Sequence, residues 1–341
     1  MGLGGLLIFL TSALLLLLSA AAARRIGFVD RPTARKQHGV AVPITGGLAV
    51  VAGSTGALLF VQANAHWFGA FAIAGAFYLL GLWDDLFGIG ARTRLLLQCV
   101  AAGLLVLSGF EVQSLGALGP LGPIAGPLFT GFCIVTCLNA ANMVDGADGL
   151  LGSALAPALM GLALTDQSPA GDLAFGTLAS VLAFLGVSNW PGSVAAPPRP
   201  YRAFLGNGGT NFLAILFCAF LLDGVDSGHL SPGAAPLLAL LPLTEITFTF
   251  ARRLAQRQSP FVADRGHLHH MALSAGWSPR RTAATYLLIC LCSTATGLLM
   301  GARSDGLLWT LAAVALSLAA ATGVLVGRSH GFPVLAKEMR P

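Results

Sequence analysis

The sequence predicts an all-α integral membrane protein, a polytopic bundle of about eleven transmembrane helices that forms one domain over residues 1–341. Of the 341 residues, 55% are hydrophobic and only 10% are charged, and the mean hydropathy is +0.78. The apolar runs are continuous rather than alternating, which favours helices over a strand barrel. We expect spans at residues 3–22, 41–62, 66–83, 95–110, 120–138, 150–165, 172–190, 204–222, 233–251, 283–301 and 307–327.

The spans are justified in order by what stands at their ends. The first opens with MGLGG, without the basic leading segment of a cleaved signal peptide, so we expect it to be retained. The third ends at DDLFG, the fifth and sixth are joined by NAANMVDGADGL, and the eighth opens within FLGNGGTNFLA. These polar segments are spaced by about sixty residues, or two spans with their loops, which returns the chain each time to the same face.

The distribution of basic residues predicts the orientation of the bundle. Of the 19 Lys and Arg residues, all except Arg303 fall after odd-numbered spans or in the C-terminal tail. The positive-inside rule then places those connections and the C-terminus in the cytoplasm, with the N-terminus outside. The net charge of +5 is therefore explained by the topology and does not indicate nucleic-acid binding.

The six cysteines lie in or beside apolar spans. Cys133 and Cys137 are four residues apart on one helix, but no His or further Cys accompanies them as a metal ligand. We expect buried free thiols and no disulfide framework.

Asp84 and Asp85 stand together where the third span ends. One interpretation is a solvated helix end. The other is that two adjacent carboxylates at a membrane boundary are costly unless they meet a metal ion or a basic partner. We prefer the second interpretation, which predicts a functional role for the pair.

The connection between the fifth and sixth spans carries two more acids. Asp145 and Asp148 are three residues apart, and Asn139 and Asn142 repeat that spacing just upstream. Such spacing puts oxygens on one side of a helix start, where one or two protein groups could hold Mg²⁺ with substrate phosphates. Asx turns around the neighbouring glycines are the alternative.

The GNGGT segment at the start of the eighth span has the glycines of a tight loop and no charge. A helix cap alone does not require glycine repeatedly, whereas a close approach of backbone does. We therefore expect this segment to meet other polar loops on the same face, with Asn207 among the site residues.

The connection after the ninth span gathers arginines and histidines in RRLAQRQSPFVADRGHLHHMAL. Zinc is disfavoured because no cysteine is near and acids are few. A clamp for an anion such as a diphosphate is the preferred interpretation. A solvated basic loop is the alternative. The connection after the first span, with Arg35, Lys36 and His38, has the same basic character.

Together these segments resemble the polyprenyl-phosphate N-acetylhexosamine-1-phosphate transferases, membrane enzymes that start lipid-linked glycan synthesis. The similarity follows the chain in order through DRPTARKQHGVAVPITGG, DDLFG with Arg94 and Gln98, NAANMVDGADGL, GNGGT and SPFVADRGHLHH. The HLHH form is similar to the branch that acts on simple UDP-N-acetylhexosamines, which includes the undecaprenyl-phosphate N-acetylglucosamine-1-phosphate transferases.

The resemblance implies that a polyprenyl phosphate attacks the β-phosphorus of a UDP-N-acetylhexosamine, releasing UMP, at the start of cell-envelope glycan synthesis. It implies Mg²⁺, or Mn²⁺ in its place, because cations must screen two anionic phosphates. It also implies a bacterial cytoplasmic membrane location, contact with membrane lipid and no nucleic-acid partner. A homodimer is an option, since dimers are common for such bundles.

The resemblance also assigns roles to residues. Asp84 and Asp85 would handle the acceptor phosphate, one of them as base. The catalytic set it implies is Asp84, Asp85, Asp145 and Asp148, with Asn142 and Asn207 as metal ligands. The substrate-binding set it implies is Arg35, Lys36, His38, Asn139, Asp264, Arg265, His267, His269 and His270.

Two positions depart from the pattern of similar proteins. Asn207 stands where they have a metal-binding Asp, and its amide brings no negative charge, so affinity for Mg²⁺ should fall. Glu245 replaces another usual Asp. Three readings stay open: an active transferase with an altered metal site, a catalytically impaired relative that still binds nucleotide sugar or lipid phosphate, and a substitution that silences an ordinary enzyme. A transporter is disfavoured because the acids line one rim rather than the midplane.

Overall fold

The computed structural model is built almost entirely of helices, which confirms the predicted fold class. It describes residues 2–30, 41–145, 149–189, 203–260, 264 and 266–329. The α-helices are α1 (Gly2–Ile26), α2 (Gly46–Gly56), α3 (Ala65–Phe87), α4 (Ala91–Leu107), α5 (Ala125–Val144), α6 (Leu150–Thr165), α7 (Pro169–Asn189), α8 (Gly206–Asp226), α9 (Ala235–Leu238), α10 (Leu240–Ala255), α11 (Leu268–Ser274), α12 (Pro279–Met300) and α13 (Asp305–Ser329). Three 3-10 turns and two short strands complete the described elements: η1 (Ala57–Leu59), η2 (Gly116–Leu118), η3 (Ala302–Ser304), β1 (Val29–Asp30) and β2 (Val42–Pro43).

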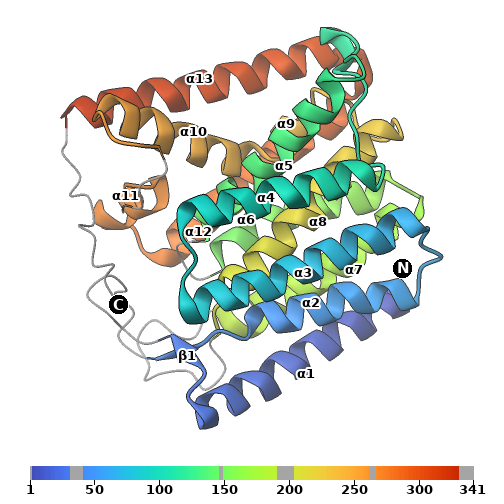
Figure 1. Cartoon of the computed structure of the whole chain (residues 1–341), viewed down its shortest axis with the longest axis vertical. Helices are drawn as coiled ribbons and strands as arrows, with labels where there is room; N and C mark the ends of the chain where they lie inside the picture. Colours follow the sequence, from blue (N-terminus) through green and yellow to red (C-terminus); the bar gives the residue numbers. More distant parts are fainter. Residues whose placement is uncertain are drawn as a thin grey trace.

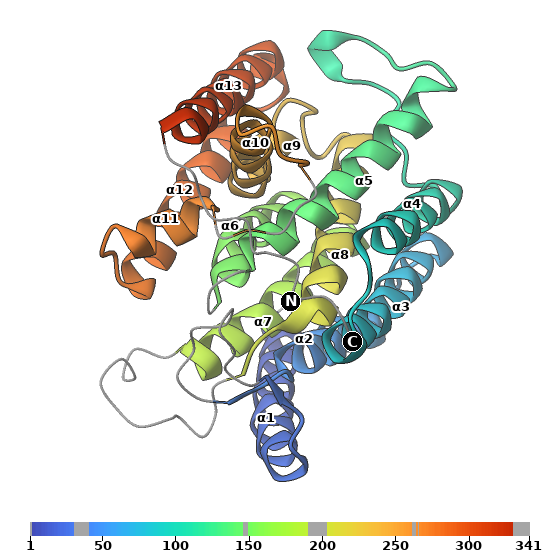
Figure 2. The same ribbon diagram turned by 60° about the vertical axis from the view of Figure 1, so that its left-hand side comes forward.

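Helix α8 lies at the centre of the bundle. It packs against α3 and α5, with further contacts to α2, α6 and α7. At the two edges lie α1, which packs on α7 and α2, and α13, which packs on α10 (Figures 1 and 2). Within their apolar windows, 83% of α8 but only 11% of α13 is buried inside the protein. The outer helices therefore leave most of their apolar surface for lipid, as expected of a membrane bundle.

Seven helices of the described chain are long and apolar enough to cross a membrane, judged by length and composition: α1, α3, α5, α7, α8, α12 and α13. The segments Gly46–Leu59 and Leu150–Thr165 are apolar but shorter. The chain is thus a multi-pass membrane protein. Eleven crossings remain a prediction, as does their orientation.

Every predicted span contains a helix, but several boundaries differ from the prediction; α2, for example, begins at Gly46 rather than at residue 41. The ninth span is divided into α9 and α10 at Ala239. The fifth helix extends to Val144 because two asparagines continue it: Asn139 and Asn142 donate their side-chain amides to the carbonyls of Val135 and Leu138, each at 2.8 Å. A prediction that ends a helix at the last apolar residue misses polar residues whose side chains bond to carbonyls of the same helix.

Two features were not predicted. The antiparallel β1–β2 pair joins the end of α1 to the segment before α2. The short helix α11 lies against α10 and α12. The six cysteines are free, as predicted, but the predicted burial holds for Cys218 and Cys290 alone. Cys133 and Cys137 are half-buried, and Cys99 and Cys292 are exposed.

Glycines bring the start of α8 unusually close to two other helices. A Cβ added at Gly81 of α3 would lie 2.5 Å from backbone atoms of Asn207 and Gly208. A Cβ at Gly47 of α2 would lie 2.8 Å from the Cα of Gly209. The GNGGT glycines therefore serve backbone-to-backbone packing, as their number predicted. This packing fixes the first turn of α8 against the end of α3.

Candidate active site at the start of α8

The first turn of α8 contacts both acids at the end of α3. The backbone N–H of Asn207 donates to Oδ2 of Asp85 at 2.9 Å, and its side-chain amide donates to Oδ2 of Asp84 at 3.3 Å. A helix N-terminus presents unsatisfied N–H groups and a partial positive charge, so carboxylates are stabilised there. The first polar segment and the third thus meet, as the spacing of the spans predicted.

Asp84 is also fixed by the segment that follows it. Its Oδ1 accepts the backbone N–H of Ile89 at 2.6 Å, and its Oδ2 lies 2.7 Å from Nη2 of Arg94. Gly88, with φ of +76°, allows the turn between α3 and α4 that makes these contacts. Both oxygens of Asp84 are therefore committed to protein donors, and Arg94 places a positive charge at the site.

The end of α5 meets the same turn of α8 from the other side. Thr210 donates its hydroxyl to Oδ2 of Asp145, and Asn142 donates its amide to Oδ1 of Asn211 at 3.0 Å. On α4, Gln98 accepts the amide of Asn139 at 2.8 Å. Four helices therefore converge here, and we call Asp84, Asp85, Asn142, Asp145 and Asn207 the α8-start cluster.

The structure corrects one detail of the sequence interpretation. For Asn139, Asn142 and Asp145 the expected position at a helix start is wrong, because the two asparagines lie in the last turns of α5 and Asp145 follows its last residue. Sequence reasoning also missed Thr210 and Asn211. Both lie one turn after Asn207 on the same helix, which is the signal that could have identified them. Asp148, Arg35, Lys36, His38 and Arg265 lie outside the described residues.

The α8-start cluster offers oxygen ligands of the kind that Mg²⁺ prefers. Within the described chain, no group of three or more His, Cys, Asp and Glu side chains is arranged to hold a metal ion. Mg²⁺ nevertheless needs only one or two carboxylates when phosphates and water supply the rest. The hydrogen bonds of Asn142 and Asn207 use their amide nitrogens, and amide oxygens are of the ligand type that Mg²⁺ accepts. The donors present therefore fit Mg²⁺ in kind.

A second group of polar residues joins the end of α10 to α11. Asp264 accepts three hydrogen bonds from two arginines. Nη2 of Arg252 donates to both carboxylate oxygens, at 2.8 and 2.7 Å, and Nε of Arg253 donates to Oδ2 at 3.0 Å. Burial opposes its ionisation, but hydrogen bonds from Arg253, Arg252 and the amide of Gly266 outweigh this and lower the pKa of Asp264 to about 2. Arg252 is fully buried. These two arginines, expected to be part of an anion clamp, are paired inside the protein.

The three histidines gather beside this ion pair. The rings of His267 and His269 are parallel with centroids 5.7 Å apart, and those of His269 and His270 are 4.1 Å apart. Nδ1 of His267 lies 3.2 Å from the hydroxyl of Thr249. Burial, followed by the neighbouring His269 and Arg253, lowers the pKa of His267 to about 3, so this ring is neutral at physiological pH.

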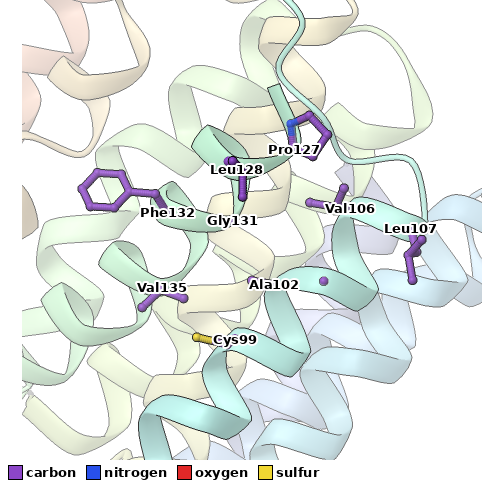
Figure 3. A pocket seen from close by; sticks show the side chains of 10 residues that line it. Cys99, Ala102, Val106, Leu107, Pro127, Leu128, Gly131, Phe132 and Val135 are labelled. Atoms are coloured by element: carbon purple, nitrogen blue, oxygen red, sulfur yellow. The ribbon is translucent and has the colours of Figure 1, made fainter. Parts of the chain in front are cut away.

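An apolar groove of about 590 Å³ lies between α4 and α5 (Figure 3). Cys99 and Val106 of α4 and Leu128 and Val135 of α5 are among its lining side chains. Cys99 directly follows Gln98, and Gln98 lines a small pocket with Asp84, Arg94 and Asn211. Neighbouring residues of α4 therefore line the apolar groove and the small polar pocket.

Comparison with known proteins agrees with the resemblance found in the sequence. The family model "Glycosyl transferase family 4" matches residues 67–225. Proteins named undecaprenyl-phosphate alpha-N-acetylglucosaminyl 1-phosphate transferase are 32% identical in Yersinia pestis over 80% of this chain and 77% of the relative. In Escherichia coli K12 the identity is 30% over the same shares, and in Thermotoga maritima it is 36% over 77% of each chain. These names give no support to an impaired relative or a transporter.

Proposed function

The chain belongs to glycosyl transferase family 4, and from this premise we propose that it transfers N-acetylglucosamine 1-phosphate from UDP-N-acetylglucosamine to undecaprenyl phosphate. The observation that carries the proposal is the α8-start cluster, which lies within the residues matched by the family model. UMP would be the second product. The reaction would start a lipid-linked glycan of the bacterial cell envelope.

In this reaction an oxygen of the acceptor phosphate bonds to the β-phosphorus of the donor as the bond from that phosphorus to the UMP oxygen breaks. Both reactants are anions, so the site must reduce their repulsion and hold them in line. The start of α8 supplies a helix N-terminus, and Arg94 supplies a fixed positive charge 2.7 Å from Asp84. Both features favour phosphate binding at the start of α8.

The two acids of α3 are assigned different tasks. Asp84 has both oxygens held by Ile89, Arg94 and Asn207, so we assign it the positioning of Arg94 and of the first turn of α8. Asp85 accepts the backbone amide that opens this turn, and we assign it the handling of the acceptor's proton. Thr210 holds Asp145 at the donor side of the cluster.

A Mg²⁺ ion bound here would screen the charge of the donor's diphosphate and of the UMP that leaves. Asp145 and the amide oxygens of Asn142 and Asn207 are the residues that would hold it. Because Asn207 contributes no charge, we expect the site to bind Mg²⁺ more weakly than one with an aspartate at this position.

The groove between α4 and α5 suits the acceptor's hydrocarbon tail. It is lined by apolar side chains, and its Cys99 directly follows Gln98, which lines the small pocket with Asp84 and Arg94. A prenyl chain lying there would place its phosphate at the α8-start cluster. We further propose that this rim faces the cytoplasm, where UDP-sugars are available, in the bacterial inner membrane.

The test is UMP release by the protein purified in detergent, given undecaprenyl phosphate and a panel of UDP-N-acetylhexosamines with and without Mg²⁺. We expect Mg²⁺-dependent UMP release with UDP-N-acetylglucosamine, together with a lipid diphosphate sugar in equal amount. Release with a different UDP-sugar would revise the donor. Absence of UMP with every donor, from protein that binds none of them, would refute the proposed function.

A further inference from the structure

The carboxylate of Glu245 is an unusual feature of the histidine segment. It lies on α10 and is completely buried, as is His269. Its Oε2 accepts the backbone N–H of Leu268 at 2.8 Å, and its Oε1 lies 2.7 Å from Nδ1 of His269. Oε1 also accepts the backbone N–H of His269 at 3.4 Å. One side chain of α10 therefore holds both the first turn of α11 and a histidine ring.

These contacts decide which atom of His269 is left over. Nδ1 of His269 is held by Oε1 of Glu245, so Nε2 is the ring nitrogen that remains for another partner. Nε2 of the same ring is buried and has no hydrogen-bond partner within the described part of the chain. A buried polar atom without a partner is costly, which points to a ligand that supplies the missing contact.

The neighbouring groups make an anion the ligand that fits this atom. An Nε2–H of His269, held in place by Glu245 at Nδ1, could donate to an oxyanion. His267 is neutral and is engaged with Thr249, whereas Arg252 and Arg253 are paired with Asp264. Tyr286 of α12 also lies near this group, with its hydroxyl buried and without a partner in the described chain. His269 is thus the fully buried member of the histidine segment with an uncommitted nitrogen.

We propose that Glu245 is a positioning residue, which fixes the first turn of α11 and orients His269 so that Nε2 meets a phosphate oxygen of the nucleotide-sugar donor. This inference rests on the proposed function. It explains why an acid occurs in the otherwise apolar LPLTEI stretch of α10, far along the chain from the histidines it holds. Glu245 itself touches no reacting atom.

The test compares steady-state kinetics of purified variants with each substrate varied in turn. Glu245→Gln removes the charge and leaves a side chain of the same size. We expect its KM for UDP-N-acetylglucosamine to rise about tenfold, in line with the loss of one charge-assisted hydrogen bond, while its KM for undecaprenyl phosphate stays unchanged. Glu245→Asp keeps the charge, so it should recover most of the donor affinity. Glu111→Gln, in the connection between α4 and α5, is the control for the same chemical change and should alter neither constant.

A second variant keeps the inference testable if Glu245→Gln fails to fold. In His269→Asn the shorter amide can still donate to Glu245, but nothing replaces Nε2. We expect this variant to unfold at the wild-type temperature and to lose donor affinity as strongly as Glu245→Gln. In the double variant the two losses should not add, because both act through the same atom.

The outcomes separate this inference from the proposed function. An active wild-type protein whose Glu245→Gln and His269→Asn variants keep the donor KM would overturn the inference alone. An equal loss of affinity for both substrates, with no recovery in Glu245→Asp, would show a merely structural carboxylate and would also overturn it. A wild-type protein that releases no UMP with any donor would refute the proposed function and the inference with it.

Discussion

The two ends of α8 use acidic residues in opposite ways. At its start, acids from α3 and α5 contact the first turn: Asp85 accepts a backbone N–H, Asp84 accepts an amide, and Asp145 accepts a hydroxyl. At its end, α8 carries its own acid, Asp223, whose Oδ1 lies 3.3 Å from Nε2 of His66. A helix dipole favours anions at the start and disfavours them at the end. This difference is the reason why we assign phosphate binding to the start of α8 and not to its end.

The acids near the end of α8 also serve to hold loops together. Asp305 accepts the backbone N–H groups of Gly233 at 2.6 Å and Ala117 at 2.7 Å, so it joins three segments. His66 reaches the carbonyl of Ser108 at 2.9 Å while facing Asp223. Hydrogen-bonded carboxylates at a membrane boundary are therefore not by themselves a sign of a substrate site. Convergence on a helix N-terminus beside an arginine is the more specific sign.

The largest expected effect is a difference in activity between a variant at the start of α8 and a variant at its end. Asp85→Asn should reduce UMP release by about a thousandfold or more, because the acceptor loses its proton-handling group. Asp223→Asn should leave it within about threefold, since no reacting group is touched. UMP release and thermal unfolding would be measured on both variants in detergent. Similar losses in the two variants would mean that the rims do not differ as described.

The next effect concerns the close packing that creates the α8-start cluster. Gly81→Ala should destabilise the protein by about 1–3 kcal/mol, because the added Cβ would press on the backbone of Asn207 and Gly208. UMP release should also fall, because the residues of the α8-start cluster would move apart. Gly75→Ala on the same helix is the control, since a Cβ there would meet nothing within 4 Å. Equal thermal unfolding temperatures for the two variants would contradict the packing argument.

A smaller effect tests the charge of the α8-start cluster. Asn207→Asp would place a carboxylate beside Asp84 and Asp85, so the variant should unfold at lower temperature in EDTA and recover in Mg²⁺. The Mg²⁺ concentration for half-maximal activity should fall by about tenfold. Asn64→Asp is the control, because an aspartate caps the start of α3 equally well. If both variants respond to Mg²⁺ like the wild type, the metal lies elsewhere.

The smallest effect belongs to the end of α8. His66→Gln removes an imidazole that bridges α3, α4 and α8, so we expect a loss of about 1 kcal/mol in the free energy of unfolding. UMP release at a temperature well below unfolding should stay unchanged. A clear loss of activity in a fully folded His66→Gln protein would show that this rim takes part in the reaction.

The sequence predicted much of the site but not its architecture. The regular spacing of DDLFG, NAANMVDGADGL and GNGGT predicted that these segments share one face, and Asp84, Asp85, Asn142, Asp145 and Asn207 do meet there. Thr210 and Asn211 were not predicted, because a hydroxyl and an amide inside an apolar helix form no recognisable sequence motif. Arg252 and Arg253 in the last turn of α10 were expected to face an anion, but Asp264 pairs with both, and such a pairing depends on the fold of the connection.

The sequence by itself determined that this is a helical membrane protein, because the length and apolarity of its runs leave few alternatives for chain in lipid. It also determined which chemical groups lie at the ends of those runs. Only the tertiary structure decided which helix ends meet, because contacts such as Gly81 with Gly208 and Glu245 with His269 join residues that no local periodicity connects. Close packing and buried hydrogen bonds, rather than hydropathy, assign each acid its partner.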